Sequence, residues 1–118
     1  MGVSYEQVRD WVLALPGGCE VMVESWGHPT LRVGDKMFAS GGPGLPTMSL
    51  KATKEEQEIL VTEQPETFAV AGYVGRFGWV EVQLSTVDED ELRDLVVAAW
   101  RRTAPKRLVR QYDAGRSR

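Results

Sequence analysis

The sequence has very little of the side-chain chemistry from which most catalytic and metal sites are built. Its 118 residues include one cysteine, Cys19, and one histidine, His28. A single cysteine excludes an internal disulfide framework and any multi-cysteine zinc site, and a lone histidine is a poor metal site. Cys19 and His28 would act as nucleophile and base only with their side chains within about 4 Å of each other. We therefore expect no metal, no cofactor and no enzymatic activity.

Long hydrophobic runs are also absent. No apolar stretch approaches the roughly 18 residues needed to span a bilayer, and the N-terminus lacks the basic and apolar regions of a secretory signal. Hydrophobic residues make up 42% of the chain and charged residues 26%, as in soluble globular proteins, and 118 residues fit one domain. These features predict a cytoplasmic, monomeric protein that does not bind membranes.

Positive charge is concentrated at the C-terminal end. The formal net charge is −3, yet residues 101–118 hold seven Lys and Arg residues against one Asp. A basic end on an acidic body is suited to contact with phosphates or an acidic partner. The simpler interpretation is a solvated tail that keeps the protein soluble.

Turn signals and hydrophobic periodicity predict the order of the elements. Ser or Thr followed three residues later by Gln or Glu predicts helices over 5–15 and 54–62, and Asp88 predicts a third helix. Alternation predicts strands over 19–26, 30–33, 36–40, 47–51 and 79–84, with a short extended piece around 68–70. Gly34 and Asp35 form the two-residue connection of a β-hairpin.

This order of one helix, four strands, a helix, a strand and a helix predicts an α+β fold. We expect an antiparallel sheet packed on one face by the N- and C-terminal helices. Residues 1–110 form the predicted domain, the chain is expected to fray beyond Val109, and 111–118 form a flexible basic tail. Thr47, Ser49 and Lys51 are expected to point away from the core. The residues expected to face the core include Val21, Val23, Met48, Leu50, Ile59 and Leu60.

The glycine-rich segment 72–78 invites a comparison with phosphate-binding loops. Such a loop follows a strand and opens a helix, so that the helix N-terminus meets the anion. Here the segment runs into the strand predicted over 79–84. We interpret it as an irregular loop whose glycines allow close approach of the backbone.

Cations and aromatic side chains gather on the predicted sheet. This combination binds nucleic-acid phosphates and stacked bases, or an anionic aromatic small molecule, and the alternative is an ordinary exposed polar face. The residues are Arg32, Lys36, Lys51, Arg76 and Trp79. The first hypothesis is weak, salt-sensitive DNA binding through the hairpins and this basic face.

A second hypothesis places a pocket beside Trp26, Tyr73 and Trp79, with His28 next to it. Such a pocket would bind a small molecule, for example an anionic aromatic metabolite, or a protein partner. His28 precedes Pro29. We interpret this histidine as a hydrogen-bonded turn residue rather than a base.

Four segments together resemble the MmcQ/YjbR-like family of small bacterial proteins. They are residues 27–39, 49–52, 73–80 and 99–106, which begin Gly-His-Pro-Thr, Ser-Leu-Lys-Ala, Tyr-Val-Gly-Arg and Ala-Trp-Arg-Arg. The resemblance implies a CyaY-like (frataxin-like) α+β domain, often described as a double wing, and a DNA-binding role by fold analogy. It implies no catalytic residues, and Ala71-Gly72 stands where many relatives carry Pro-His. Positions that the family tends to keep correspond to Lys36, Lys51, Tyr73, Arg76 and Trp79.

Overall fold

Strands from both halves of the chain join into one antiparallel sheet in the computed structural model, which describes residues 2–116. The strand order in the sheet is β1-β2-β3-β4-β6-β5, and all neighbouring strands run antiparallel. The predicted α+β fold is confirmed. The elements in chain order are α1 (Tyr5–Leu13), β1 (Gly18–Val23), β2 (His28–Val33), β3 (Lys36–Ser40), β4 (Thr47–Leu50), α2 (Lys54–Glu63), β5 (Phe68–Val70), the 3-10 helix η1 (Gly75–Phe77), β6 (Val80–Gln83), α3 (Glu89–Thr103) and α4 (Lys106–Arg116).

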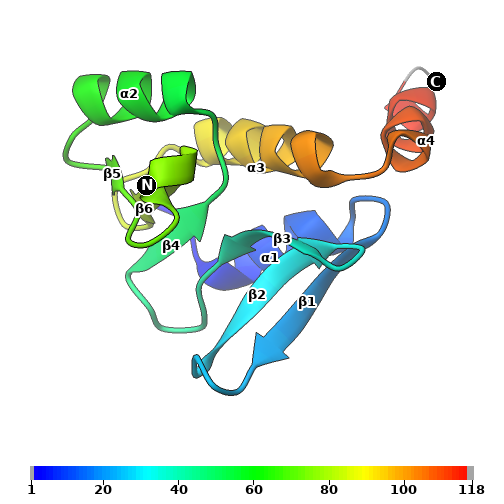
Figure 1. Cartoon of the computed structure of the whole chain (residues 1–118), viewed down its shortest axis with the longest axis horizontal. Helices are drawn as coiled ribbons and strands as arrows, with labels where there is room; N and C mark the ends of the chain where they lie inside the picture. Colours follow the sequence, from blue (N-terminus) through cyan, green and yellow to red (C-terminus); the bar gives the residue numbers. More distant parts are fainter. Residues whose placement is uncertain (1, 117–118) are drawn as a thin grey trace.

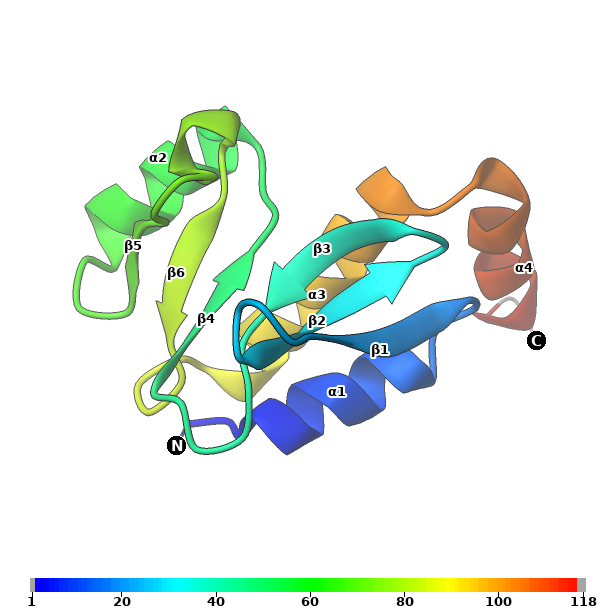
Figure 2. The ribbon, with the colours of Figure 1, turned by 60° about the horizontal axis from the view of Figure 1, so that its bottom comes forward.

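Helices α1 and α3 pack together on one side of the sheet (Figures 1 and 2). The core lies between these helices and the central strands, and its fully buried side chains include Val8, Phe38, Val80 and Trp100. Burying a side chain of this kind contributes about 1.5–3 kcal/mol relative to leaving it in water. Helix α2 lies beside β5 at one end of the sheet. We call the side of the sheet away from α1 and α3 the open face.

The predicted turn and helix starts are confirmed. Gly34 has a φ of +61° in the two-residue connection between β2 and β3, a value that glycine adopts without strain. Ser4 and Thr53 each form a complete capping box, and Asp88 accepts a hydrogen bond from the backbone N–H of Glu91. None of the helices in the described part of the chain is both long and apolar enough to cross a membrane.

A β-bulge in β3 decides which of its side chains share a face. The register between β2 and β3 shifts after Leu31, which leaves Phe38 as an extra residue in β3. An extra residue breaks the strict alternation of faces along a strand. Phe38 and Ala39 are consecutive, yet both are fully buried. Met37 and Ser40, on either side of them, therefore both lie on the open face.

Two predictions of inward-facing side chains are wrong. Val21 and Val23 lie on the open face of β1, an edge strand, so neither joins the core. Ile59 is 54% exposed, whereas Gln57 and Leu60 are buried. Residues three apart share a helix face, so Gln57 and Leu60 point inward together and Ile59 does not. The predicted burial of Met48 and Leu50 is confirmed.

The C-terminal end is a helix as far as Arg116, not the frayed segment predicted beyond Val109. Tyr112 of α4 packs edge-on against Trp100 of α3, with ring centroids 5.3 Å apart. The Arg101 guanidinium donates two hydrogen bonds to the Asp113 carboxylate, which hold the pKa of Asp113 below its usual range. These contacts, which the hydrophobic periodicity does not reveal, tie α4 to α3. Residues 117–118 of the predicted tail lie outside the described residues.

Candidate binding cleft

A cleft of about 640 Å³ is found on the open face of the sheet. The residues that line it come from four parts of the chain, which only the fold brings together. They are Trp26 from the β1–β2 turn and His28 from the start of β2, Met37 and Ser40 from β3, Ser49 from β4, and residues 72–74 and Trp79 from the segment between β5 and β6. The cleft thus joins the residues predicted to surround a pocket, namely Trp26, His28, Tyr73 and Trp79.

Trp26 and His28 contact each other at one side of the cleft. Their ring centroids are 5.9 Å apart, and Trp26 is 53% exposed. His28 Nδ1 lies 3.1 Å from the carbonyl oxygen of Pro29. Because a carbonyl oxygen only accepts, Nδ1 must carry a proton, and Nε2 of the neutral ring is then a hydrogen-bond acceptor. The interpretation of His28 as a hydrogen-bonded residue is confirmed, although it begins β2 instead of lying in the turn.

Two serines form a polar floor of the cleft. Ser40 of β3 and Ser49 of β4 are direct partners across the two strands. Their neighbours Ala39, Met48 and Leu50 are buried in the core, so the pleat places both serines on the open face. Among residues 2–116, neither serine hydroxyl has a hydrogen-bond partner. Both hydroxyls are therefore available to a ligand.

Tyr73 lies beside the cleft in a strained backbone conformation. Its φ is +55°, the one positive value at a non-glycine residue within the described chain. The Val74 N–H donates to the carbonyl of Gly72 at 2.5 Å, which closes a three-residue turn around Tyr73. A left-handed conformation costs a non-glycine residue about 1–2 kcal/mol. The side chain is fully exposed, so its own burial does not offset that cost.

One buried amide holds the segment that carries Tyr73 and Trp79. Gln57 of α2 donates from Nε2 to the carbonyl oxygens of Gly75, at 2.7 Å, and Trp79, at 2.8 Å. Gly78 has a φ of +101°, and a Cβ there would lie 2.8 Å from backbone atoms of residues 52–54. The glycine-rich segment is therefore an irregular loop of close backbone approach, as predicted, and it leads into β6. Trp79 is held against the cleft and is 7% exposed.

The predicted basic face is interrupted at Lys51. Lys51 Nζ donates to Thr103 Oγ1 of α3 at 3.1 Å, so this side chain is directed to the helix side of the sheet. The prediction that Lys51 points away from the core is wrong, because β4 ends at Leu50 and the alternation of faces ends with it. Ser49 does lie on the open face, as predicted.

The remaining predicted cations are spread over the molecule. Arg32 donates from Nε to Thr30 Oγ1 at 2.8 Å and from Nη1 to the carbonyl of Asp35 at 3.4 Å. Lys36 is exposed at the β2–β3 turn, and Arg76 is exposed on η1 with its guanidinium 4.8 Å from the Phe77 ring centroid. Figures 1 and 2 place the β2–β3 turn near α4 and η1 near α2, on opposite sides of the molecule. The structure does not bring Lys36, Lys51 and Arg76 together.

Cys19 and His28 lie far apart on the β1–β2 hairpin. Cys19 is paired with Arg32, whereas His28 is at the other end of β2, paired with Val23. Four residues along a strand correspond to about 13 Å. The two side chains therefore do not form a nucleophile–base pair. No group of three or more His, Cys, Asp or Glu side chains that could hold a metal ion occurs among the residues described.

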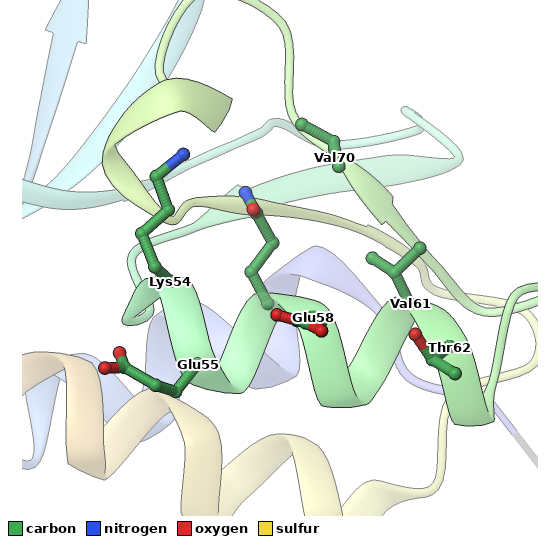
Figure 3. A pocket seen from close by; sticks show the side chains of 7 residues that line it. Lys54, Glu55, Glu58, Val61, Thr62 and Val70 are labelled. Carbon is green, nitrogen blue, oxygen red and sulfur yellow. The ribbon is translucent and has the colours of Figure 1, made fainter.

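A second hollow, of about 570 Å³, runs along α2 beside β5. Figure 3 shows Lys54, Glu58, Val61 and Val70 around it. Its charged side chains are exposed and of both signs, and Gln57, its one buried polar residue, already has its amide bonded to backbone carbonyls. This hollow offers a ligand fewer fixed polar groups than the cleft, so we regard the cleft as the candidate site.

Several residues of the site were missed by sequence reasoning. Met37 and Ser40 share a face only because of the bulge in β3, and no residue pattern in the sequence predicts this bulge. Gly72 and Val74 were included only in a glycine-rich loop without a binding role. Gln57 was overlooked among the acidic residues of α2, although its place three residues before Leu60 is a signal that it faces inward.

Comparisons with known proteins give a family and a fold. A family model described as YjbR matches residues 13–102, which include all six strands. The crystal structure of a Deinococcus radiodurans protein with a DUF419 domain is similar over 82% of this chain and 75% of that chain, with a TM-score of 0.74 and 23% sequence identity. No curated protein matches the chain. At this identity the structural likeness shows a shared fold and no more.

Replacing Gln57 by Glu should destabilise the protein by about 1–3 kcal/mol, because a carboxylate cannot donate to the two carbonyl oxygens that the amide satisfies. Urea unfolding measures the change. The exposed Glu58 on the same helix provides the control, and Glu58→Gln should change stability by less than about 0.5 kcal/mol. Equal stability of Gln57→Glu and the native chain would show that this amide does not hold the loop.

Tyr73→Gly and Tyr73→Ala both remove the aromatic ring, but only glycine adopts the left-handed conformation without strain. We expect the glycine variant to be more stable than the alanine variant by about 1 kcal/mol. Thermal and urea unfolding of the pair measure this difference. An alanine variant as stable as the glycine variant would contradict the strain assigned to position 73.

Proposed function

The chain belongs to the YjbR family, and we propose that it is a monomeric, non-enzymatic binding protein whose open-face cleft holds a planar ligand. The observation that carries this proposal is the pair of exposed aromatic rings at the cleft, Trp26 and the fully exposed, strained Tyr73. Exposed aromatic surface around a hollow is typical of ligand sites, and backbone strain gathers at such sites.

The cleft combines apolar walls with a few polar groups. Trp26 and Tyr73 offer exposed flat surfaces on which a ring can stack, and the buried Trp79 forms part of the wall. Stacking on one aromatic side chain is worth about 1–3 kcal/mol. The hydroxyls of Ser40 and Ser49 and the Nε2 of His28 would fix the orientation of the ring by hydrogen bonds. The proposal concerns binding alone, because Cys19 and His28 lie apart and no other nucleophile–base pair is assigned.

Removing the Trp26 ring should weaken binding of a planar compound by about 1–3 kcal/mol. The probes are adenosine, nicotinamide and their anionic counterparts AMP and nicotinate, titrated while tryptophan fluorescence and thermal stability are recorded. Trp26→Ala leaves Trp79 in the cleft as a reporter. Ile59→Ala, which removes an exposed apolar side chain on α2, serves as the control and should bind like the native protein. Equal affinity in the Trp26→Ala variant would argue against this site.

DNA binding is the second candidate function, and the position of α4 favours it. Lys106, Arg107 and Arg110 are exposed within little more than one turn of this helix. Figures 1 and 2 show α4 on the same side of the molecule as the β2–β3 turn. Lys36 follows directly after this turn in the sequence. Clustered cations of this kind contact phosphates. The interface proposed for DNA is therefore this basic end, which we define as Lys36, Lys106, Arg107 and Arg110.

If the basic end binds DNA, the logarithm of the affinity should fall with the logarithm of the salt concentration by about 0.9 per phosphate contacted. Arg107→Ala and Arg110→Ala should each reduce that slope by about 1. Arg76→Ala, on the distant η1, should leave it unchanged. Mobility shifts at several salt concentrations measure the slopes, and no shift at low salt with micromolar protein would exclude DNA as the ligand.

A further inference from the structure

We propose that the cleft selects an uncharged heteroaromatic ring with hydrogen-bonding groups on its edge, in preference to an aromatic anion. This inference rests on the proposed function and names the class of ligand that the same site takes. It departs from the anionic ligand expected from the sequence, because none of the four cations that suggested an anion lines the cleft.

The lining of the cleft contains no Asp, Glu, Lys or Arg side chain. Two charged residues of the open face lie next to it and are of opposite sign: Glu81 is paired with Ser49, and Arg32 with Met37. Arg32 already donates to Thr30 and to the carbonyl of Asp35. An anion in the cleft would lose hydration without meeting a cation among the lining residues, and the negative charge of Glu81 next to the cleft would repel it.

The polar groups in the cleft suit the edge of a neutral ring. Ser40 and Ser49 are adjacent across β3 and β4, and each hydroxyl can donate one hydrogen bond and accept others. His28 adds an acceptor. Its Nδ1 is hydrogen-bonded to the carbonyl oxygen of Pro29, so in the neutral ring Nε2 remains available to accept a hydrogen bond from a ligand. Donors and acceptors placed side by side match a ring edge that carries an amide, or the edge of a nucleobase. A carboxylate, which only accepts, could not bond to Nε2 of the neutral His28 ring.

The aromatic residues determine the shape of the ligand. Trp26 and Tyr73 expose flat rings at the cleft, whereas the buried Trp79 contributes only part of its wall. A planar ring can stack on these surfaces while its edge reaches the serines. The same chemistry is offered by a free nucleoside-like compound and by an unpaired base in a single strand of nucleic acid.

The direct test compares ring systems that differ in charge. Adenosine and AMP share a base and sugar and differ in the negative charge of the phosphate, and nicotinamide and nicotinate share a ring and differ in both the charge and the N–H donors of the amide. We expect the neutral member of each pair to bind at least about tenfold more tightly in fluorescence and thermal-shift titrations, because burying an unpaired charged group costs about 1.4 kcal/mol or more. A short single strand of deoxyadenosines, measured against adenosine, distinguishes an unpaired base from a free nucleoside.

Two variants test the polar contacts, and a third provides the control. Ser49→Ala removes one hydroxyl from the floor, and His28→Phe keeps an aromatic ring while removing the acceptor. Each should weaken binding of nicotinamide about five- to tenfold, the effect of one hydrogen bond. Ser85→Ala changes an exposed serine outside the cleft and should leave the affinity unchanged.

The outcomes separate this inference from the proposed function. Tighter binding of the neutral compounds, weakened by both variants, supports the inference. Binding of nicotinate or AMP as tightly as nicotinamide or adenosine overturns the inference and leaves the proposed function in place. No fluorescence change and no thermal shift with any of the four compounds at millimolar concentration overturns both.

Discussion

The cleft depends on the two hydrogen bonds that Gln57 donates to the loop before β6. They join α2 to the carbonyls of Gly75 and Trp79, and so hold the segment in which Tyr73 and Trp79 lie. Each bond contributes about 0.5–1.5 kcal/mol net, and together they match the cost of about 1–2 kcal/mol for the left-handed Tyr73. A buried amide on one helix thus offsets the strain that presents an aromatic ring to solvent.

The floor of the cleft depends in turn on the bulge at Phe38. One extra residue lets β3 direct both Phe38 and Ala39 into the core and both Met37 and Ser40 to the open face. Ser40 then lies beside Ser49, where two free hydroxyls meet. The core on one side of the sheet and the polar floor on the other are therefore set by the same irregularity in β3.

Sequence patterns predicted most helices and strands, but they predicted fewer of the side chains that lie on the surface around the cleft. The capping residues, the Gly34 turn and the alternation in β4 act locally, so their positions could be read directly, and the aromatic residues of the cleft were recognised. Features that depend on contacts between distant parts of the chain were not predicted. Lys51 turns to Thr103 because β4 ends one residue earlier, and α4 is ordered by contacts with α3. The hydrogen bonds of Gln57 require a loop 18 and 22 residues away.

The central claim is that the open face binds a planar, uncharged ring. Backbone amide chemical shifts recorded during a titration with adenosine test it most directly, because they report where a ligand binds as well as whether it does. The largest changes should fall in residues 26–28, at Ser40 and Ser49, and over 72–79, with little change in α2 or α4. Changes centred on α4 or along α2, with the cleft unaffected, would contradict it.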